Sequence, residues 1–324
     1  METKIKEMQN LISESKSVAL FAHINADGDA VGSVMATKHY LDDIGKETYV
    51  FLQEPISQDF AFLGVHKFAN KNSLQQYDLA ICLDSPTTKR FGEYEKEFFK
   101  AKKSIKIDHH ILVDEYATLE IVDSEISSAC ELLYRIFKKL NVNITPEIAT
   151  CLYTGIATDT GGFLHGNHGE VTPNTWRTVA ELVESGADLK NINYNVFIRM
   201  SKGVFELNKE VLSRAEFFAE GKIAMVTLPN AVLQNTGTEL MDTHKFMDLF
   251  TGIDGVEITA FLTELKANEN AVSVRSQNHS AQRICKHFGG GGHLKAAGCR
   301  IFVPLEIAKS LLLEECKNEL YRND

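Results

Sequence analysis

This chain has no pair of cysteines at Cys-x-x-Cys spacing. Its six cysteines are scattered, at positions 82, 130, 151, 285, 299 and 316. The sequence therefore favours neither a zinc knuckle nor a thioredoxin-type redox pair. Cys82 and Cys151 lie in apolar runs and are expected to be reduced core thiols. A chain of 324 residues buries about three quarters of its unfolded surface, so it needs no disulfide to form a core.

Long apolar runs and an excess of basic residues are also missing. No segment approaches the roughly 18–20 apolar residues of a membrane span, and the polar N-terminus METKIKEMQNLISES does not look like a signal peptide. We therefore expect a soluble cytoplasmic protein without a membrane partner. Lys and Arg number 34 against 44 Asp and Glu, a net charge of −10. Such a surface disfavours long duplex nucleic acid but allows a small anionic substrate in a local basic pocket.

The first half of the chain alternates short apolar runs with segments of helical periodicity. The predicted strands cover 17–23, 48–52, 78–83, 104–107 and 118–122, and the predicted helices cover 29–44, 127–140, 146–158 and 173–185. Strands that alternate with helices indicate an α/β fold with a mostly parallel sheet flanked by helices. Ligands of such sheets bind at the carboxyl ends of the strands.

The pattern changes after residue 187. The asparagine-rich segment 188–203 has no strand signal and is interpreted as a partly helical linker. We expect a larger α/β domain over 1–187 and a smaller α+β domain over 204–324. In the smaller domain we predict helices over 204–220 and 281–288, strands over 222–228, 256–262, 271–275 and 298–303, and a final amphipathic helix.

Carboxylates and histidines follow four segments of the larger domain. Taken alone, each has a structural explanation, because carboxylates cap helices and polar residues end strands. Asp159 is harder to explain, since a carboxylate at the end of a helix opposes the helix dipole. Together the four segments deliver carboxylates and imidazoles to one edge of the sheet. The residues are His23, Asp27 and Asp29; Asp84; Asp108, His109 and His110; and Asp159.

Carboxylates and imidazoles without thiolates suit Mn²⁺, Mg²⁺, Zn²⁺ or Fe²⁺. Five or six such ligands are too many for one tetrahedral zinc. They suit two divalent ions about 3.5–4 Å apart that share a bridging carboxylate, as in enzymes that hydrolyse phosphoesters. The motifs therefore predict a two-metal site.

A second candidate group lies in the smaller domain. A run of glycines frees backbone N–H groups to approach a phosphate closely, although this run matches neither the P-loop nor the GxGxxG pattern. The alternatives are a tight turn for the glycines and an ordinary surface ion pair for the arginine. The candidate phosphate contacts are Arg275, Ser276, Gly290, Gly291, Gly292 and His293.

On these motifs the chain resembles the DHH phosphoesterase superfamily. Asp108-His109-His110 is the triplet that names the family, and the order of the four acidic motifs matches the family's order. Arg275-Ser276 and GGGGHLKAAG resemble the associated C-terminal DHHA1 domain. Length and layout most resemble the NrnA branch, which comprises oligoribonucleases for very short RNA that often also act on 3'-phosphoadenosine 5'-phosphate.

The resemblance implies a role for each motif residue. The implied metal ligands are His23 and Asp27 for one ion, Asp29, His109 and Asp159 for the other, and Asp84 as the bridge. The implied catalytic residues are Asp84, His110 facing the scissile phosphate, and Asp108 orienting a histidine. The implied substrate contacts are Arg275, Ser276, Gly290, Gly291, Gly292 and His293. The implied cofactors are two divalent ions, with Mn²⁺ favoured over Mg²⁺, Co²⁺ or Fe²⁺.

The chain departs from the family pattern in two places. Ala26 stands where the family usually has proline, which removes no ligand. Leu164 stands where the branch commonly has arginine, and His165 or His168 is a candidate replacement contact; a solvent-exposed loop is the alternative.

The function implied is hydrolysis of very short oligoribonucleotides to nucleoside 5'-monophosphates by a homodimer. Four alternatives stay open: an inorganic pyrophosphatase, a RecJ-type single-strand exonuclease, a phosphodiesterase for cyclic or linear dinucleotides, and a nucleotide-binding module without activity. The DHHA1-like segment argues against the pyrophosphatase, and the length of the chain argues against RecJ.

Overall fold

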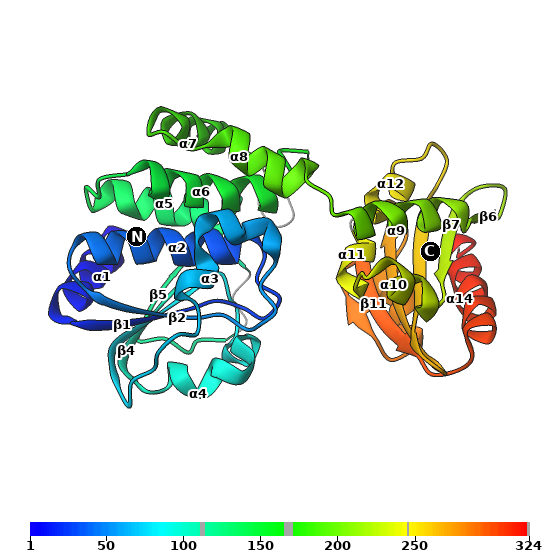
Figure 1. The fold of residues 1–324 in the computed structure, drawn as a ribbon, viewed down its shortest axis with the longest axis horizontal. Helices are drawn as coiled ribbons and strands as arrows, with labels where there is room; N and C mark the ends of the chain where they lie inside the picture. Colours follow the sequence, from blue (N-terminus) through cyan, green and yellow to red (C-terminus); the bar gives the residue numbers. More distant parts are fainter. Residues whose placement is uncertain (111–113, 165–170, 245, 323–324) are drawn as a thin grey trace. The chain divides into compact units, whose positions relative to one another are not determined.

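The computed structural model describes residues 1–110, 114–164, 171–244 and 246–322. The chain divides into two compact units, residues 1–199 and 200–324 (Figure 1). Across the described residues, no helix combines the length and the apolar character that a membrane span needs.

The first unit is built on a five-stranded sheet in which every pair of neighbours is parallel. The strand order is β2-β1-β3-β4-β5. Leu20 faces Ile81 across β1 and β3, and Ile81 faces Ile105 across β3 and β4. The parallel sheet expected from the sequence is therefore confirmed. The strands are β1 (Ser17–Phe21), β2 (Glu47–Phe51), β3 (Tyr77–Leu83), β4 (Ala101–Asp108) and β5 (Leu119–Val122).

Helices cover both faces of this sheet (Figure 1). Successive strand residues point to opposite faces, so each face has its own core. Leu20 and Ile81 belong to the larger, aliphatic core. Phe21 and Cys82 belong to an aromatic core with Phe91. The helices are α1 (Glu2–Glu14), α2 (Gly28–Asp43), α3 (Val65–Phe68), α4 (Glu95–Phe98), α5 (Ala129–Lys139), α6 (Pro146–Asp159), α7 (Pro173–Glu184) and α8 (Leu189–Asn193), with 3-10 turns at Gln58–Leu63 and Thr88–Tyr94.

Two glycines let α2 and α6 approach closely. A Cβ on Gly32 would lie 2.5 Å from the carbonyl oxygen of Cys151. A Cβ on Gly155 would lie 2.2 Å from Cys130 Sγ and 2.6 Å from Asp29 Oδ1. All three distances are far shorter than van der Waals contact, so only glycine fits at either position. This close approach brings the start of α2 beside the second half of α6.

The second unit holds a six-stranded mixed sheet in the order β10-β11-β9-β8-β7-β6. β7 and β8 are parallel, and the other neighbours are antiparallel. The α+β class of the smaller domain is confirmed. The strands are β6 (Ala215–Phe218), β7 (Ile223–Leu228), β8 (Ile258–Lys266), β9 (Glu269–Ser276), β10 (Gly291–Gly292) and β11 (Ala296–Ile301); the helices are α9 (Lys202–Ser213), α10 (Asn230–Thr236), α11 (Leu240–His244), α12 (Met247–Thr251), α13 (Ala281–His287) and α14 (Leu305–Leu320).

Some predicted elements differ in the structure. The helix predicted over 204–220 ends at Ser213, and β6 follows it, because the segment pairs antiparallel with β7 through a turn in which Ala219 and Glu220 have positive φ. The segment 188–203, interpreted as a linker, contains α8 and a π-helical turn over Tyr194–Ile198. Ile192 of α8 is buried in the aliphatic core of the first unit, so α8 belongs to that unit.

Candidate functional site

The predicted residues of the first unit meet at the carboxyl edge of its sheet. Carboxyl ends of parallel strands share one edge, which explains why residues far apart in the sequence converge. Three groups each offer ligand atoms that lie within 4.8 Å of one another. Asp84 and His109 each belong to two of the groups. The groups are His23, Asp27 and Asp84; Asp29, His109 and Asp159; and Asp84, His109 and His110.

Asp27 both caps α2 and faces the cluster. Its Oδ1 accepts hydrogen bonds from the backbone N–H groups of Asp29 and Ala30, both at 3.0 Å. Its Oδ2 lies 3.8 Å from His23 Nε2. His23 Nδ1 lies 2.7 Å from the carbonyl oxygen of Ile24, a contact that keeps the proton on Nδ1 and leaves Nε2 as a ligand atom. Capping and ligation are therefore compatible at this helix start.

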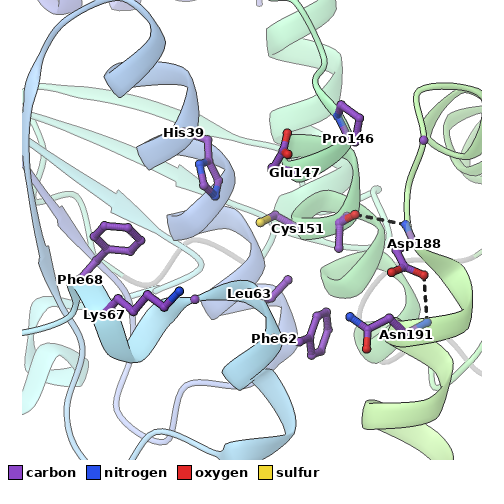
Figure 2. Close-up of a pocket in the computed structure, with 13 residues that line it drawn as sticks. His39, Phe62, Leu63, Lys67, Phe68, Pro146, Glu147, Cys151, Asp188 and Asn191 are labelled. Carbon is purple, nitrogen blue, oxygen red and sulfur yellow. Dashed lines mark hydrogen bonds between the residues drawn. The ribbon is translucent and has the colours of Figure 1, made fainter.

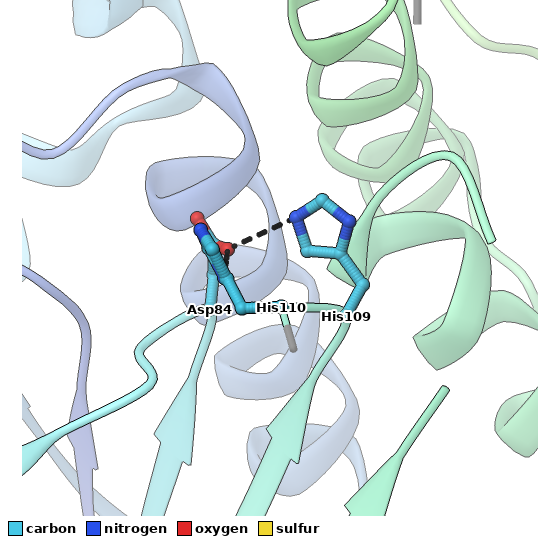
Figure 3. A group of neighbouring side chains, drawn as sticks. All are labelled: Asp84, His109 and His110. Carbon is cyan, nitrogen blue, oxygen red and sulfur yellow. Dashed lines mark ion pairs between the residues drawn. The ribbon is translucent and has the colours of Figure 1, made fainter. Parts of the chain in front are cut away.

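Asp84 occupies the centre of the cluster. It follows β3 directly, has a φ of 53°, and is only 2% exposed. Its Oδ2 lies 3.3 Å from His23 Nε2, and its Oδ1 lies 3.4 Å from His109 Nε2 and 3.6 Å from His110 Nδ1. Figure 3 shows the Asp84 carboxylate close to the two histidines that follow β4, with its ion pairs dashed. One carboxylate with an imidazole near each oxygen has the arrangement of a bridging ligand.

Asp108 hydrogen-bonds the two histidines and is not a member of the three ligand groups. Its Oδ1 accepts hydrogen bonds from the backbone N–H of His109 at 2.9 Å and of His110 at 3.3 Å. The same oxygen lies 2.9 Å from His110 Nδ1. Asp108 thus sets the orientation of the His110 ring. Its Oδ2 faces the ammonium group of Lys106 at 3.6 Å, and both side chains are fully buried.

Asp29 is held by the start of another helix. Its Oδ2 accepts from the backbone N–H of Ala129 at 2.7 Å, and its Oδ1 accepts from Cys130 at 2.9 Å. These are the first residues of α5, whose helix dipole stabilises a negative charge there. Asp29 Oδ2 still lies 3.8 Å from His109 Nε2, and Asp159 Oδ2 lies 3.5 Å from that atom.

The cluster carries more negative charge than its histidines can offset. Burial and the neighbouring Asp84 raise the pKa of Asp29 to about 7, and burial and Asp29 raise the pKa of Asp159 to about 9. Burial lowers the pKa of His23, but the Asp27 and Asp84 carboxylates outweigh it and raise that pKa to about 10. Such shifts arise where carboxylates crowd without enough counter-charge.

A divalent cation fits this donor set. Asp84 Oδ1 and Asp159 Oδ2 are buried and accept no well-aligned hydrogen bond from the described residues. Buried carboxylate oxygens normally have a partner, and a cation would be one. The donors are oxygen and imidazole nitrogen without sulfur, which suits the divalent metals of phosphoester hydrolysis.

Comparisons with known proteins place the chain in a family. The model of the DHH family, N-terminal domain, matches residues 17–156. A bifunctional oligoribonuclease and PAP phosphatase NrnA of Thermus thermophilus is 31% identical over 307 residues, which cover 94% of this chain and 90% of that protein. The chain belongs to the DHH family. It is accordingly a phosphoesterase, and thus a hydrolase, as the sequence predicts.

A further relative and two solved structures are also similar to this DHH protein along most of its length. The protein named bifunctional oligoribonuclease and PAP phosphatase NrnA of Bacillus subtilis is 26% identical, over 91% of this chain and 93% of that one. The crystal structure of an exopolyphosphatase-related protein from Bacteroides fragilis superposes with a TM-score of 0.89 at 24% identity, covering 98% of this chain and 96% of that one. Exonuclease RecJ bound to manganese gives a TM-score of 0.55 at 12% identity, covering 100% of this chain and 95% of that one. These structural similarities confirm the fold.

The candidate phosphate contacts of this DHH protein gather on β9 and the β10–β11 hairpin of the second unit. Arg275 pairs with Ala296 between β9 and β11. A Cβ on Gly290 would lie 2.3 Å from the carbonyl oxygen of Gly298, and Gly292 has a φ of 142°. These two glycines are therefore required by the hairpin itself. Gly291 has open space at its Cβ position. Ser276 ends β9, and His293 begins the turn between β10 and β11.

Leu164 is 87% exposed, and His165 and His168 lie outside the described residues. A separate cavity of the first unit is lined by His39, Lys67, Glu147 and Asp188, among others (Figure 2). Glu147 is at the start of α6, about 18 Å along the helix axis from Asp159 at its end. This cavity is therefore not part of the metal cluster.

Sequence reasoning missed two parts of the site. Lys106 alone interrupts the apolar end of β4, between Ile105 and Ile107, and a lysine at such a position signals a buried partner. The contact of Asp29 with the start of α5 has no local signal, because 100 residues separate the two segments.

Proposed function

We propose that this DHH hydrolase converts very short oligoribonucleotides to nucleoside 5'-monophosphates, and that it also removes the 3'-phosphate of 3'-phosphoadenosine 5'-phosphate. The observation that carries the proposal is the pair of ligand groups that meet at Asp84. The names of the relatives that match along almost the whole chain support the substrate class.

The geometry of the cluster supports the metal ligands that the family resemblance implies. One divalent ion would be held by His23 and Asp27, a second by Asp29, His109 and Asp159, and both by Asp84. Mn²⁺ is the favoured metal. Two bound divalent ions would supply Lewis acidity toward the phosphoryl oxygens and a hydroxide nucleophile at neutral pH.

His110 is the side chain that would contact the scissile phosphate. Asp108 holds its Nδ1 at 2.9 Å, so Nδ1 carries the proton and the ring cannot turn freely. The opposite ring nitrogen, Nε2, would face the substrate. In the imidazolium form, with a proton on both ring nitrogens, Nε2–H would donate to a phosphoryl oxygen and offset the charge that gathers there in the transition state.

The second unit would bind the substrate phosphates through Arg275, Ser276, the loop Gly290–Gly292 and His293. We take this unit to be the DHHA1 domain, over 204–324. Arg275→Ala should leave the metal content unchanged and lower kcat/KM on a dinucleotide. The loss of transition-state stabilisation should be about 2–5 kcal/mol, the cost of removing one partner from a buried charged hydrogen bond. Undiminished cleavage of the dinucleotide by this variant would contradict the role of the second unit.

A substrate panel with Mn²⁺ tests the function as a whole. The panel comprises a dinucleotide, a five-mer, a twenty-mer, 3'-phosphoadenosine 5'-phosphate, cyclic dinucleotides and pyrophosphate. A chain with a net charge of −10 offers a long strand few further cationic contacts to its phosphates. We therefore expect kcat/KM to be highest for two to four nucleotides. Binding should depend only weakly on salt concentration. Equal efficiency on the dinucleotide and the twenty-mer would favour a RecJ-type exonuclease. Sedimentation and cell fractionation would test the proposed homodimer and its cytoplasmic location.

A further inference from the structure

The chain's only tryptophan is half exposed and stacked on a second aromatic ring. Trp176 is 51% exposed, although tryptophan is usually well buried. Its ring lies 4.5 Å from that of Phe163, centroid to centroid, with an angle of 29° between the planes. The ring of the buried Tyr153 lies 6.4 Å from that of Phe163, centroid to centroid. The stacked pair therefore has support on the protein side, while half of the tryptophan remains in solvent.

Phe163 is presented by a strained turn at the end of α6. It has a φ of 69°, in the left-handed region that non-glycine residues rarely adopt. Gly161 and Gly162 before it also have positive φ, and the backbone N–H of Phe163 donates to Thr160 Oγ1 at 3.1 Å. Four residues span at most about 14 Å, so the Cα atom of Phe163 lies within that distance of the Cα atom of Asp159.

The residue before Trp176 connects α7 to the helix turn that holds Asp29. Its neighbour Thr175 is fully buried and donates through Oγ1 to Glu131 Oε2 at 2.9 Å. Glu131 belongs to the first turn of α5, the same turn whose N–H groups hold Asp29. The first turn of α7 is thus anchored to the segment that positions a proposed metal ligand.

We propose that Phe163 and Trp176 form a stacking platform for one nucleobase of the substrate. The proposal rests on the proposed function, in which the substrate is an oligoribonucleotide. An exposed ring beside a phosphate-binding centre is how proteins hold bases of single strands, since every base offers a flat face to stack on. One platform serves one base, which matches a substrate of very few nucleotides.

Fluorescence of Trp176 reports on the platform directly, because the protein has a single tryptophan. We expect saturable quenching on titration with adenosine 5'-monophosphate and no quenching with ribose 5-phosphate, which has the same phosphate and no base. An equal response to both compounds would overturn the proposal. So would the absence of quenching at concentrations of adenosine 5'-monophosphate that inhibit hydrolysis.

Kinetics of variants give a second test. Trp176→Ala should raise KM for an adenine dinucleotide roughly 5-fold to 150-fold, the range for loss of one base–aromatic stack. The ratio of kcat/KM between this dinucleotide and an abasic analogue should fall by the same factor. Trp176→Phe should recover most of the loss. Val183→Ala is the matched control, because it lies on the same helix and is 41% exposed.

A change in KM of equal size on the abasic analogue would overturn the platform. A change in sedimentation without a change in the base-dependent ratio would identify a protein interface instead. If wild-type protein hydrolyses no oligonucleotide, the proposed function fails, and the fluorescence titration still decides whether the rings bind a base.

Discussion

Lys106→Met tests the most buried charge pair of the site. The Lys106 side chain is fully buried, with its Nζ 3.6 Å from Asp108 Oδ2. It also donates to the carbonyl oxygens of Pro86 at 3.4 Å and Asp114 at 3.3 Å. With an effective dielectric constant of about 20, two unit charges 3.6 Å apart attract each other by about 4–5 kcal/mol. Methionine keeps the length of the side chain and removes its charge.

We expect Lys106→Met to lower the free energy of unfolding of the first unit by about 3–5 kcal/mol, because Asp108 is left as an uncompensated buried charge. Activity should fall as well, since Asp108 orients His110. Removing both charges in Lys106→Met/Asp108→Asn should recover much of the stability but not the activity. Lys103→Met is the control, because Lys103 is exposed on the same strand, and its effect should stay within about 0.5 kcal/mol.

The assay is urea unfolding of the full chain, monitored by circular dichroism. It compares the wild type, the single variants Lys106→Met and Asp108→Asn, and the double variant that combines them. The two single effects should fail to add by about 2 kcal/mol or more, as expected for residues in direct contact. Additive effects would show that Lys106 acts through the two carbonyl groups and not through Asp108. A Lys106→Met protein within about 1 kcal/mol of wild type would refute the buried pair, whose loss should cost several times that.

Three further outcomes are expected. Asp84→Ala should lower the content of both metals and His23→Ala mainly of one; full metal occupancy of Asp84→Ala in elemental analysis would exclude the bridge. Gly155→Ala should cost about 1–3 kcal/mol through overpacking, because its Cβ would lie 2.6 Å from Asp29 Oδ1, and an unchanged melting temperature would contradict this contact. In metal-free protein, the raised pKa values of Asp29 (about 7) and Asp159 (about 9) mean that the folded state holds protons more tightly than the unfolded one. This contribution to stability is complete below pH about 4 and is lost as the pH rises through those two values. Thermal melts with and without Mn²⁺ should therefore diverge as pH rises, and parallel curves would count against the site.

Local sequence pattern was sufficient for the parallel sheet and for the position of its polar edge. The periodicity of strands and helices can be recognised from residues that are close in the sequence. The carboxyl ends of parallel strands then lie at one edge of the sheet. That is why the sequence predicts that Asp84, which follows β3, and His109, which follows β4, lie close together. Their ring-to-carboxylate distance of 3.4 Å confirms that they are neighbours.

Other features were decided by tertiary structure alone. The burial of Lys106 depends on which strands and loops surround the end of β4. The stack of Phe163 on Trp176 depends on how α7 packs after α6, and β6 exists because β7 offers it a partner. The position of Lys106 between two isoleucines signals that it has a buried partner, but the partner itself, like the stack and β6, depends on contacts between segments that only packing brings together. Neighbouring residues along the chain are therefore enough to predict which groups lie at the edge of the sheet, whereas the charges and rings that support those groups come from packing between distant segments.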